Sequence, residues 1–148
     1  ALVPGKFSRR IQVVNAPLLK NTLSSGERFV RVDEALGKPS ITDFKVREYF
    51  GAETLVEAAP RTGRTHQIRV HLAFKGHPIL GDTKYGDRAL EAKYRELGLE
   101  RMFLHAEKIT FTDPVSGKDM TITAPLPQEL EAVLTNLRAR DQEEGLIE

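Results

Sequence analysis

Several stretches of the chain alternate apolar and polar side chains, the pattern of a strand with one buried face. Val30 and Val32 alternate with polar neighbours, Phe44 and Val46 do the same, and a weaker alternation runs over 54–59. These three stretches are predicted to be strands.

The second half of the chain adds another strand and a hairpin. Phe103, Ile109 and Phe111 mark the strand, and residues 113–117 read DPVSG, a turn sequence. The apolar positions in 120–122 follow that turn, so the two segments are predicted to pair as a hairpin.

Helical spacing of apolar residues appears in three places. Helices are predicted over about 65–75, over 90–97 with Gly98 as the stop, and over 130–137 with Pro127 near its first turn. Strands and helices alternate without a regular βαβ rhythm, which favours an α+β fold. We expect a mixed, mostly antiparallel sheet with flanking helices.

Composition is that of an ordinary globular chain. The 148 residues suit one domain, expected over 1–140, with an acidic and frayed tail over 141–148. There is no cysteine, and no apolar run approaches the roughly 20 residues of a membrane helix. These features favour a cytoplasmic protein without disulfides and with no membrane partner.

The first residues read as the end of a strand. Ala1–Val3 is apolar and meets a turn at Pro4 and Gly5, with no starting Met. We therefore expect a partial domain cut from a longer protein, with an exposed sheet edge near Ala1 that the missing N-terminal half or a second chain covers.

The net charge of +1 hides a segregation of charge along the chain. Residues 1–31 hold six Lys or Arg against one Glu, and 61–88 hold six against two Asp, whereas 129–148 hold six acids against two Arg. Such segregation can produce a basic surface for nucleic acid, although a solvated face with accidental clustering gives the same counts.

The densest candidate chemistry lies at the start of the first helix. Gly63 allows a tight turn, and Thr65 is the expected N-cap. Arg64 precedes a helix N-terminus, whose unpaired N–H groups favour phosphate. His66 and Arg69 are three residues apart, so we expect them on one helix face beside a cleft.

Each of these residues also has a plain structural interpretation. Arg69 can be a structural arginine that ties the helix to a strand, and Lys84 can pair with an aspartate instead of reaching an RNA phosphate. His66 and His71 are five residues apart, which turns them away from each other on a helix. No metal site is therefore predicted, and a metal-dependent hydrolase is disfavoured.

The same residues carry a family resemblance. Residues 63–72 read GRTHQIRVHL, 76–82 read GHPILGD, and 84–86 read KYG. With Leu104-His-Ala later in the chain, they resemble the RluA-type RNA pseudouridine synthases. The segment 16–40 is similar to the RluC branch, which acts on large-subunit ribosomal RNA. The resemblance covers about residues 1–140.

Membership would imply a pseudouridine synthase fold and the isomerisation of uridine in RNA, with no metal or organic cofactor. The uridine would be flipped out of its stack into a cleft. By the family pattern, Arg69 pairs with the catalytic aspartate. Ile68 and Leu104 would line the uracil pocket, and Arg64, His66 and Lys84 would contact substrate.

The chain departs from the family at one decisive point. The family's aspartate stands in a His-Arg-Leu-Asp motif, which this sequence lacks. Asp82 and Asp87 lie downstream and are not expected to replace it. The 148 residues alone are therefore expected to be inactive, and a noncatalytic RNA-binding module is the alternative.

Overall fold

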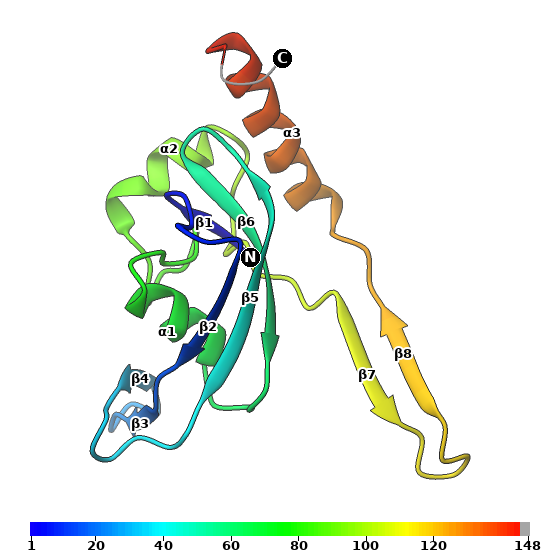
Figure 1. The fold of residues 1–148 in the computed structure, drawn as a ribbon. Coiled ribbons are helices and arrows are strands. Elements are labelled where there is room, and N and C mark those ends of the chain that lie inside the picture. Colours follow the sequence, from blue (N-terminus) through cyan, green and yellow to red (C-terminus); the bar gives the residue numbers. More distant parts are fainter. Residues whose placement is uncertain (146–148) are drawn as a thin grey trace.

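The computed structural model describes residues 1–145 and arranges them around one antiparallel sheet (Figure 1). Within the described residues, no helix is both long and apolar enough to cross a bilayer. In chain order the elements are β1 (Leu2–Pro4), β2 (Ile11–Asn15), β3 (Leu18–Thr22), β4 (Arg28–Val32), β5 (Ile41–Tyr49), β6 (Glu53–Pro60), α1 (Gln67–Phe74), the 3-10 turn η1 (Arg88–Leu90), α2 (Glu91–Arg95), β7 (Lys108–Thr112), β8 (Asp119–Thr123) and α3 (Gln128–Glu143).

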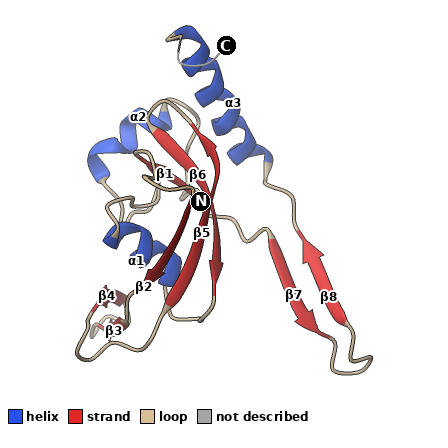
Figure 2. Ribbon diagram, in the orientation of Figure 1, coloured by secondary structure: helices blue, strands red, loops and turns tan. Residues whose placement is uncertain are grey.

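The central sheet has the strand order β1-β6-β5-β2 (Figure 2). All its pairings are antiparallel, with Phe44 of β5 opposite Ala58 of β6 and Gln12 of β2. A bulge between Val46 and Glu48 shifts the β5–β6 register. The α+β class and the strands expected around Val30, Phe44 and 54–59 are confirmed, but none of the pairings among the described residues is parallel.

One face of this sheet is buried under α1. Alternate residues of β5 point inward, so Phe44 is 1% exposed and Val46 is also buried. They pack with Val56 of β6 and with Leu72 of α1 in one apolar cluster. The period-two pattern of the strands and the helical spacing of α1 therefore meet in the same core, which fixes α1 against the sheet.

A second apolar cluster holds α3 in place. The stripe Leu130, Val133, Leu134 and Leu137 packs on Phe50, near the turn between β5 and β6. Residues of β1, of α2 and of loops complete this cluster: Leu2, Tyr94, Leu80, Leu99 and Phe103. The predicted C-terminal helix is thus confirmed, and its apolar stripe faces the body of the molecule.

Two hairpins extend the body. β3 pairs with β4 beside α1, and β7 pairs with β8 in an arm that projects away from the sheet (Figure 1). All strand residues of the arm are exposed. The hairpin was predicted, but its strand begins only at Lys108. Phe103 instead lies in a loop and is 1% exposed, because its backbone bonds to Leu2 and Leu80.

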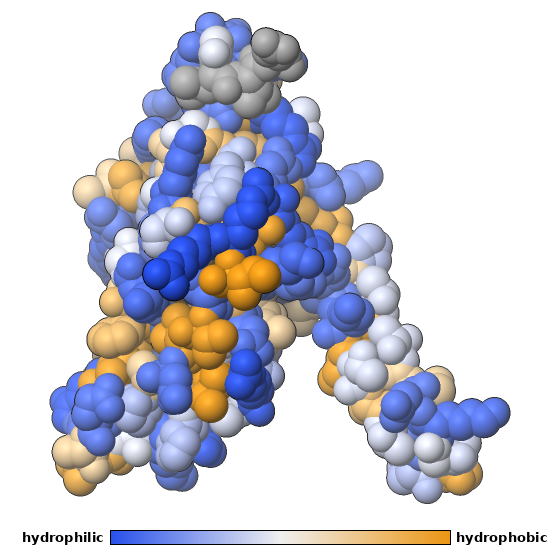
Figure 3. Space-filling view, in the orientation of Figure 1, coloured by the Kyte–Doolittle hydropathy of each residue, from blue (hydrophilic) through white to orange (hydrophobic). Residues whose placement is uncertain are grey.

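The expected open edge near Ala1 is wrong at Leu2. The outer N–H of Leu2 donates to the Phe103 carbonyl, and the Leu2 carbonyl accepts from Leu80. The opposite edge of the sheet is β2, which within the described residues pairs only with β5. Its side chains Ile11 and Val13 are 68% and 53% exposed. Figure 3 shows apolar atoms gathered over this strand and bordered by hydrophilic ones.

The expected frayed tail is also wrong for its first residues. α3 continues to Glu143, and Asp141 is 1% exposed, accepting a hydrogen bond from the Gly51 N–H. Beside it, Arg140 forms a two-point ion pair with buried Glu53, with N···O distances of 2.9 and 2.7 Å. These hydrogen bonds and this ion pair therefore fix the end of the helix against the body of the molecule. The last residues of the predicted tail, 146–148, lie outside the described residues.

Truncation of one leucine on α3 should test this packing. Leu137 is fully buried, so Leu137→Ala should lower the free energy of unfolding by about 2–5 kcal/mol, measured by urea denaturation. Leu36→Ala is the matched control, because Leu36 is 70% exposed in a turn and its truncation should change stability by less than about 0.5 kcal/mol. Equal effects of the two substitutions would contradict the assigned core.

Candidate active site

The loop before α1 is held by one glutamine. The Gln67 side chain accepts hydrogen bonds from Thr62 and from the Arg64 N–H, and it donates to the Ile41 carbonyl and to Thr42. Since Ile41 and Thr42 lie on β5, this side chain fastens the start of the helix directly to the sheet.

The predicted N-cap at Thr65 is wrong. The helix begins at Gln67, its N-cap residue is His66, and no side chain caps it. His66 has φ 54°, a left-handed conformation that no other non-glycine residue within 1–145 adopts. His66 therefore precedes the helix instead of lying on its face with Arg69, as the spacing had indicated.

Arg69 on α1 is held in a nearly buried ion pair with Asp82. The Arg69 Nε donates to Asp82 Oδ2 at 2.8 Å, and Nη2 donates to Oδ1 at 2.7 Å. The Asp82 side chain is 0% exposed and that of Arg69 is 18% exposed. The plain structural interpretation of Arg69 is thus seen in the structure, with the partner on a loop and not on a strand.

Asp82 also organises the loop that carries it. Its Oδ1 accepts the backbone N–H groups of Lys84 and Tyr85, at 2.9 and 3.1 Å. Burial alone would raise the pKa of Asp82, but the bonds from Arg69 and from these two amides hold the pKa below its ordinary value. Asp82 is therefore a charged, fully bonded and inaccessible group, which agrees with the expectation that it is not a nucleophile.

Part of the Arg69 guanidinium remains available. Within the described residues Nη1 has no hydrogen-bond partner, and no side-chain N or O atom without a partner is buried there. Nη1 must therefore reach solvent. Arg69 lines an open recess of about 260 Å³ together with Gly81, Asp82, Thr83, Glu91, Arg95, Leu99, Glu100, Arg101 and Met102.

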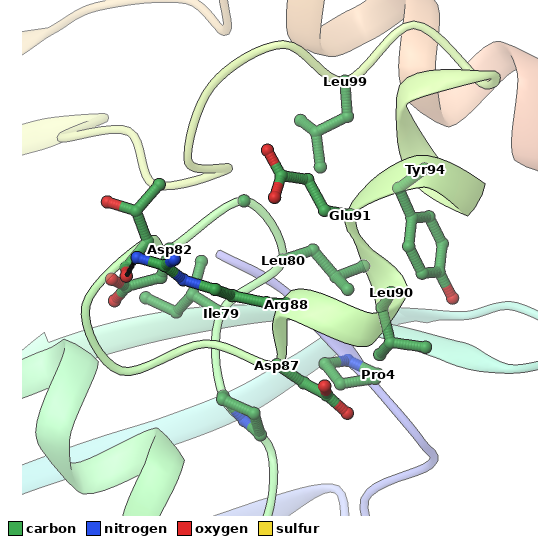
Figure 4. Close-up of a pocket in the computed structure, with 13 residues that line it drawn as sticks. Pro4, Ile79, Leu80, Asp82, Asp87, Arg88, Leu90, Glu91, Tyr94 and Leu99 are labelled. Atoms are coloured by element: carbon green, nitrogen blue, oxygen red, sulfur yellow. Dashed lines mark hydrogen bonds between the residues drawn. The ribbon is translucent and has the colours of Figure 1, made fainter.

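A smaller cavity lies next to this recess. Figure 4 shows it between the loop that carries Asp82 and the helical segment with Leu90 and Tyr94. Its volume is about 30 Å³, enough for no more than about two water molecules. The recess at Arg69 is therefore much the larger of these two spaces.

Tyr85 brings His66 and Arg69 together. The Tyr85 hydroxyl lies 2.8 Å from His66 Nδ1, and the Arg69 guanidinium carbon lies 5.1 Å from the centre of the Tyr85 ring. Burial, followed by the charges of Arg69 and Lys84, lowers the pKa of His66, so the imidazole is neutral near pH 7. The imidazole and the guanidinium thus contact the same tyrosine, although they do not share a helix face as the spacing had indicated.

The remaining predicted substrate residues divide into two groups. Ile68 and Leu104 are both partly buried and pack against the same apolar cluster, and neither lines the recess at Arg69. Lys84 instead turns to β4, donating to the Arg28 carbonyl at 2.7 Å and pairing with Glu27 at 3.2 Å.

Arg64 lies apart from these side chains. It is exposed, and its Nε donates to the Pro39 carbonyl at 3.0 Å. Its hydrogen bonds lead to Gln67 and Pro39 and not to Arg69, so the structure does not gather Arg64 and Arg69 around one point.

His71 lies in the core and has a different role from His66. Its Nε2 donates to the Ala16 carbonyl at 2.9 Å, so Nδ1 accepts from the Thr42 hydroxyl at 2.8 Å. No three side chains among His, Asp and Glu gather as metal ligands within residues 1–145. His71 therefore ties α1 to the sheet.

Sequence reasoning missed Asp82 as the partner of Arg69. The available signal was an acidic residue between two glycines, Gly81 and Gly86, in a loop directly after the helix. Gly81 has φ +84°, and a Cβ on Gly86 would lie 2.2 Å from the Asp82 carbonyl oxygen. Both positions therefore require glycine, which shows that this loop is built to return an acid toward the helix.

Comparison with known proteins places these features in a family. Residues 5–74, which include Arg69, match the family model described as RNA pseudouridylate synthase. The chain is 52% identical over 139 residues to the ribosomal large subunit pseudouridine synthase C of Haemophilus ducreyi, and 51% identical over 140 residues to that of Escherichia coli K12. The chain belongs to the RNA pseudouridylate synthase family.

Solved structures of the family agree with the fold. The structure of human RNA pseudouridylate synthase domain containing 1 matches 94% of this chain with a TM-score of 0.69. The structure of human RNA pseudouridylate synthase domain containing 4 matches 93% with a TM-score of 0.70, and each is 26% identical in sequence. The matched part is 64% and 60% of those chains, and 43% of the Haemophilus and 44% of the Escherichia coli protein. The predicted family and its fold are thus confirmed, whereas the roles of individual residues stay predictions.

Substitution of Asp82 should show how much the ion pair stabilises the fold. Asp82→Asn leaves Arg69 nearly buried without a counter-charge, so the free energy of unfolding should fall by on the order of 3 kcal/mol in urea denaturation. Asp43→Asn is the matched control, because Asp43 makes the same two-point pair with Arg61 on an exposed surface. A loss at Asp82 no larger than that at Asp43 would contradict a structural role for the buried pair.

The buried histidine predicts a pH dependence of stability. Burial lowers the pKa of His71, and the bond to Ala16 only partly opposes this, so the unfolded chain takes up the proton more readily than the folded one. The free energy of unfolding should therefore fall as pH drops below about 6.5, by up to roughly 1.4 kcal/mol per pH unit.

Urea denaturation between pH 5.5 and 7.5 measures this slope. His71→Gln should flatten it, while His105→Gln, at a half-buried position outside the core, should change it less. His66 contributes in the same direction, so His66→Gln is measured in parallel. An unchanged slope in His71→Gln would refute the assignment.

Proposed function

We propose that this chain forms part of an enzyme that isomerises uridines to pseudouridine in large-subunit ribosomal RNA. The observation that supports the proposal is that Asp82 bonds to only two of the three guanidinium nitrogens of Arg69. Asp82 bonds to Nε and Nη2, Nη1 is unpaired within the described residues and not buried, and Arg69 lines the open recess. The names of the relatives, which are about half identical to this chain, support the reaction and the RNA class.

The geometry suits a second carboxylate. An arginine has five N–H donors in a rigid fork, and its end can bind a carboxylate while its side binds another. A catalytic aspartate from a segment outside these 148 residues would meet Nη1 there, and the positive charge would keep it ionised. Asp82 restrains the guanidinium beforehand, so little side-chain freedom is lost when the aspartate pairs with it.

The other predicted substrate residues fit this arrangement to different degrees. Ile68 and Leu104, which pack against the same apolar cluster, would form the apolar wall beside the uracil. His66 would donate a hydrogen bond to the RNA, and exposed Arg64 would approach a phosphate. Lys84, bound to β4, would first have to exchange its contact with Glu27 for one with RNA. The proposed reaction would need no metal or organic cofactor, and an enzyme that acts on large-subunit ribosomal RNA would work in the cytoplasm.

Loss of Arg69 should nearly abolish turnover. In the whole protein, Arg69→Ala should slow the release of tritium from 5-tritiated uridine in 23S ribosomal RNA by about 100- to 1,000-fold, because the catalytic carboxylate loses its counter-charge. The 148 residues alone should release none. Arg138→Ala is the matched control, since Arg138 on α3 forms a two-point pair with Glu48 on β5 and does not line the recess.

Two outcomes would overturn the proposal. Unimpaired turnover by Arg69→Ala would remove its role, and no tritium release by the unsubstituted whole protein would remove the reaction. In the second case, salt-dependent RNA binding by the chain would favour the noncatalytic RNA-binding module, which the basic residues of 1–31 also support.

A further inference from the structure

Tyr85 occupies a central position among the candidate site residues. Its ring is partly buried against Val30 and Val70, and its backbone N–H donates to Asp82. Its hydroxyl accepts the Val30 N–H at 3.0 Å and lies 2.8 Å from His66 Nδ1. One side chain thus touches the small β3–β4 sheet, helix α1 and the residue that precedes the helix.

The hydrogen bonds around the Tyr85 hydroxyl fix the position of its proton. The oxygen already accepts from a backbone N–H, which can only donate. If His66 Nδ1 also donated, the hydroxyl hydrogen would have no acceptor within the described residues. Donation from Tyr85 O–H to His66 Nδ1 satisfies all three groups. Neutral His66 then carries its hydrogen on Nε2.

The Nε2 atom points to accessible space. It has no hydrogen-bond partner among residues 1–145, and no unpartnered side-chain N or O atom is buried there. The left-handed backbone of His66, with φ 54°, presents the ring edge-on to Tyr85, with 5.5 Å between the ring centres. His66 therefore has one nitrogen held inward and one N–H directed outward.

Arg69 is in contact with the same tyrosine. Its guanidinium carbon lies over the Tyr85 ring at 5.1 Å, within the range of a cation–π contact. Asp82 holds the Arg69 side chain from one direction, and the Tyr85 ring supports it from another.

From these contacts we propose that Tyr85 is a positioning residue. It holds His66 in the Nε2–H tautomer as a directed donor to an acceptor oxygen of the bound RNA, and it steadies Arg69 beside it. The part that concerns RNA rests on the proposed function, whereas the tautomer is a property of the chain itself. Burial and the neighbouring charges of Arg69 and Lys84 lower the pKa of His66, which supports a neutral ring.

Nitrogen-15 NMR of histidine-labelled chain tests the tautomer directly. In unsubstituted chain near pH 7.5, His66 should show a pyrrole-type Nε2 and a pyridine-type Nδ1, with the resonances assigned by their loss in His66→Gln. Tyr85→Phe removes the donor and should give a mixture of both tautomers. Tyr49→Phe is the matched control, because the Tyr49 hydroxyl bonds to the Phe7 carbonyl, and it should leave His66 unchanged.

Two spectra would overturn the proposal. The first is a spectrum of the unsubstituted chain with the His66 hydrogen on Nδ1. This measurement does not depend on whether any variant folds. The other is an unchanged His66 tautomer in a folded Tyr85→Phe chain.

Kinetics separate this proposal from the proposed function. In the whole protein, Tyr85→Phe should lower kcat/KM for tritium release by about tenfold, the effect of one misdirected hydrogen bond. If the tautomer shifts and kcat/KM is unchanged, the hydrogen bond from Tyr85 to His66 is supported, but its role in binding RNA is refuted. Normal turnover by Arg69→Ala would refute the role of Arg69 and leave the tautomer result standing.

Discussion

The ion pair between Arg69 and Asp82 is the interaction on which the candidate site depends. An arginine this close to the core cannot remain without a counter-charge, because the desolvation of its guanidinium would be uncompensated. Asp82 supplies the charge with two short hydrogen bonds and also accepts two backbone amides of its own loop. The pair therefore joins helix and loop and sets the direction of the remaining guanidinium nitrogen.

The fold supplies rigid supports on both sides of this pair. α1 carries Arg69 and is held to the sheet by Leu72, by Gln67 and by the buried His71. The loop after the helix carries Asp82, and its residue Leu80 bonds to the strand β1 through the backbone. A functional group anchored at two independent places loses less freedom on binding than one on a mobile loop, and this favours the recess at Arg69 as the reactive centre.

The sequence predicted the elements whose residues repeat with a regular period. The strands around Phe44 and Val56 and the stripe on α3 follow directly from side chains that must be buried. It did not predict features that depend on contacts across the fold. Phe103 resembles a strand residue, yet tertiary hydrogen bonds hold it in a loop.

The same distinction applies to the site. The sequence marked Arg69 and His66 by residue type and spacing, and it marked Ile68 and Leu104 through the family resemblance. It could not show that Asp82 returns to Arg69 across 13 residues, or that Tyr85 links His66 to β4. Helical periodicity placed His66 on the same face as Arg69, and the structure reaches a similar proximity through a left-handed residue ahead of the helix.

The left-handed conformation of His66 gives a physical reason to regard it as functional. Such a backbone costs a non-glycine residue roughly 1–2 kcal/mol, and glycine would adopt it without strain. A histidine here is therefore explained by what its side chain does. Its Nδ1 meets the Tyr85 hydroxyl, and its other nitrogen is left at the surface near Arg69. The strained backbone at His66 lowers stability, and it lets the imidazole and the Arg69 guanidinium both contact Tyr85. Such local strain is typical of a site that orients two hydrogen-bond donors toward one ligand.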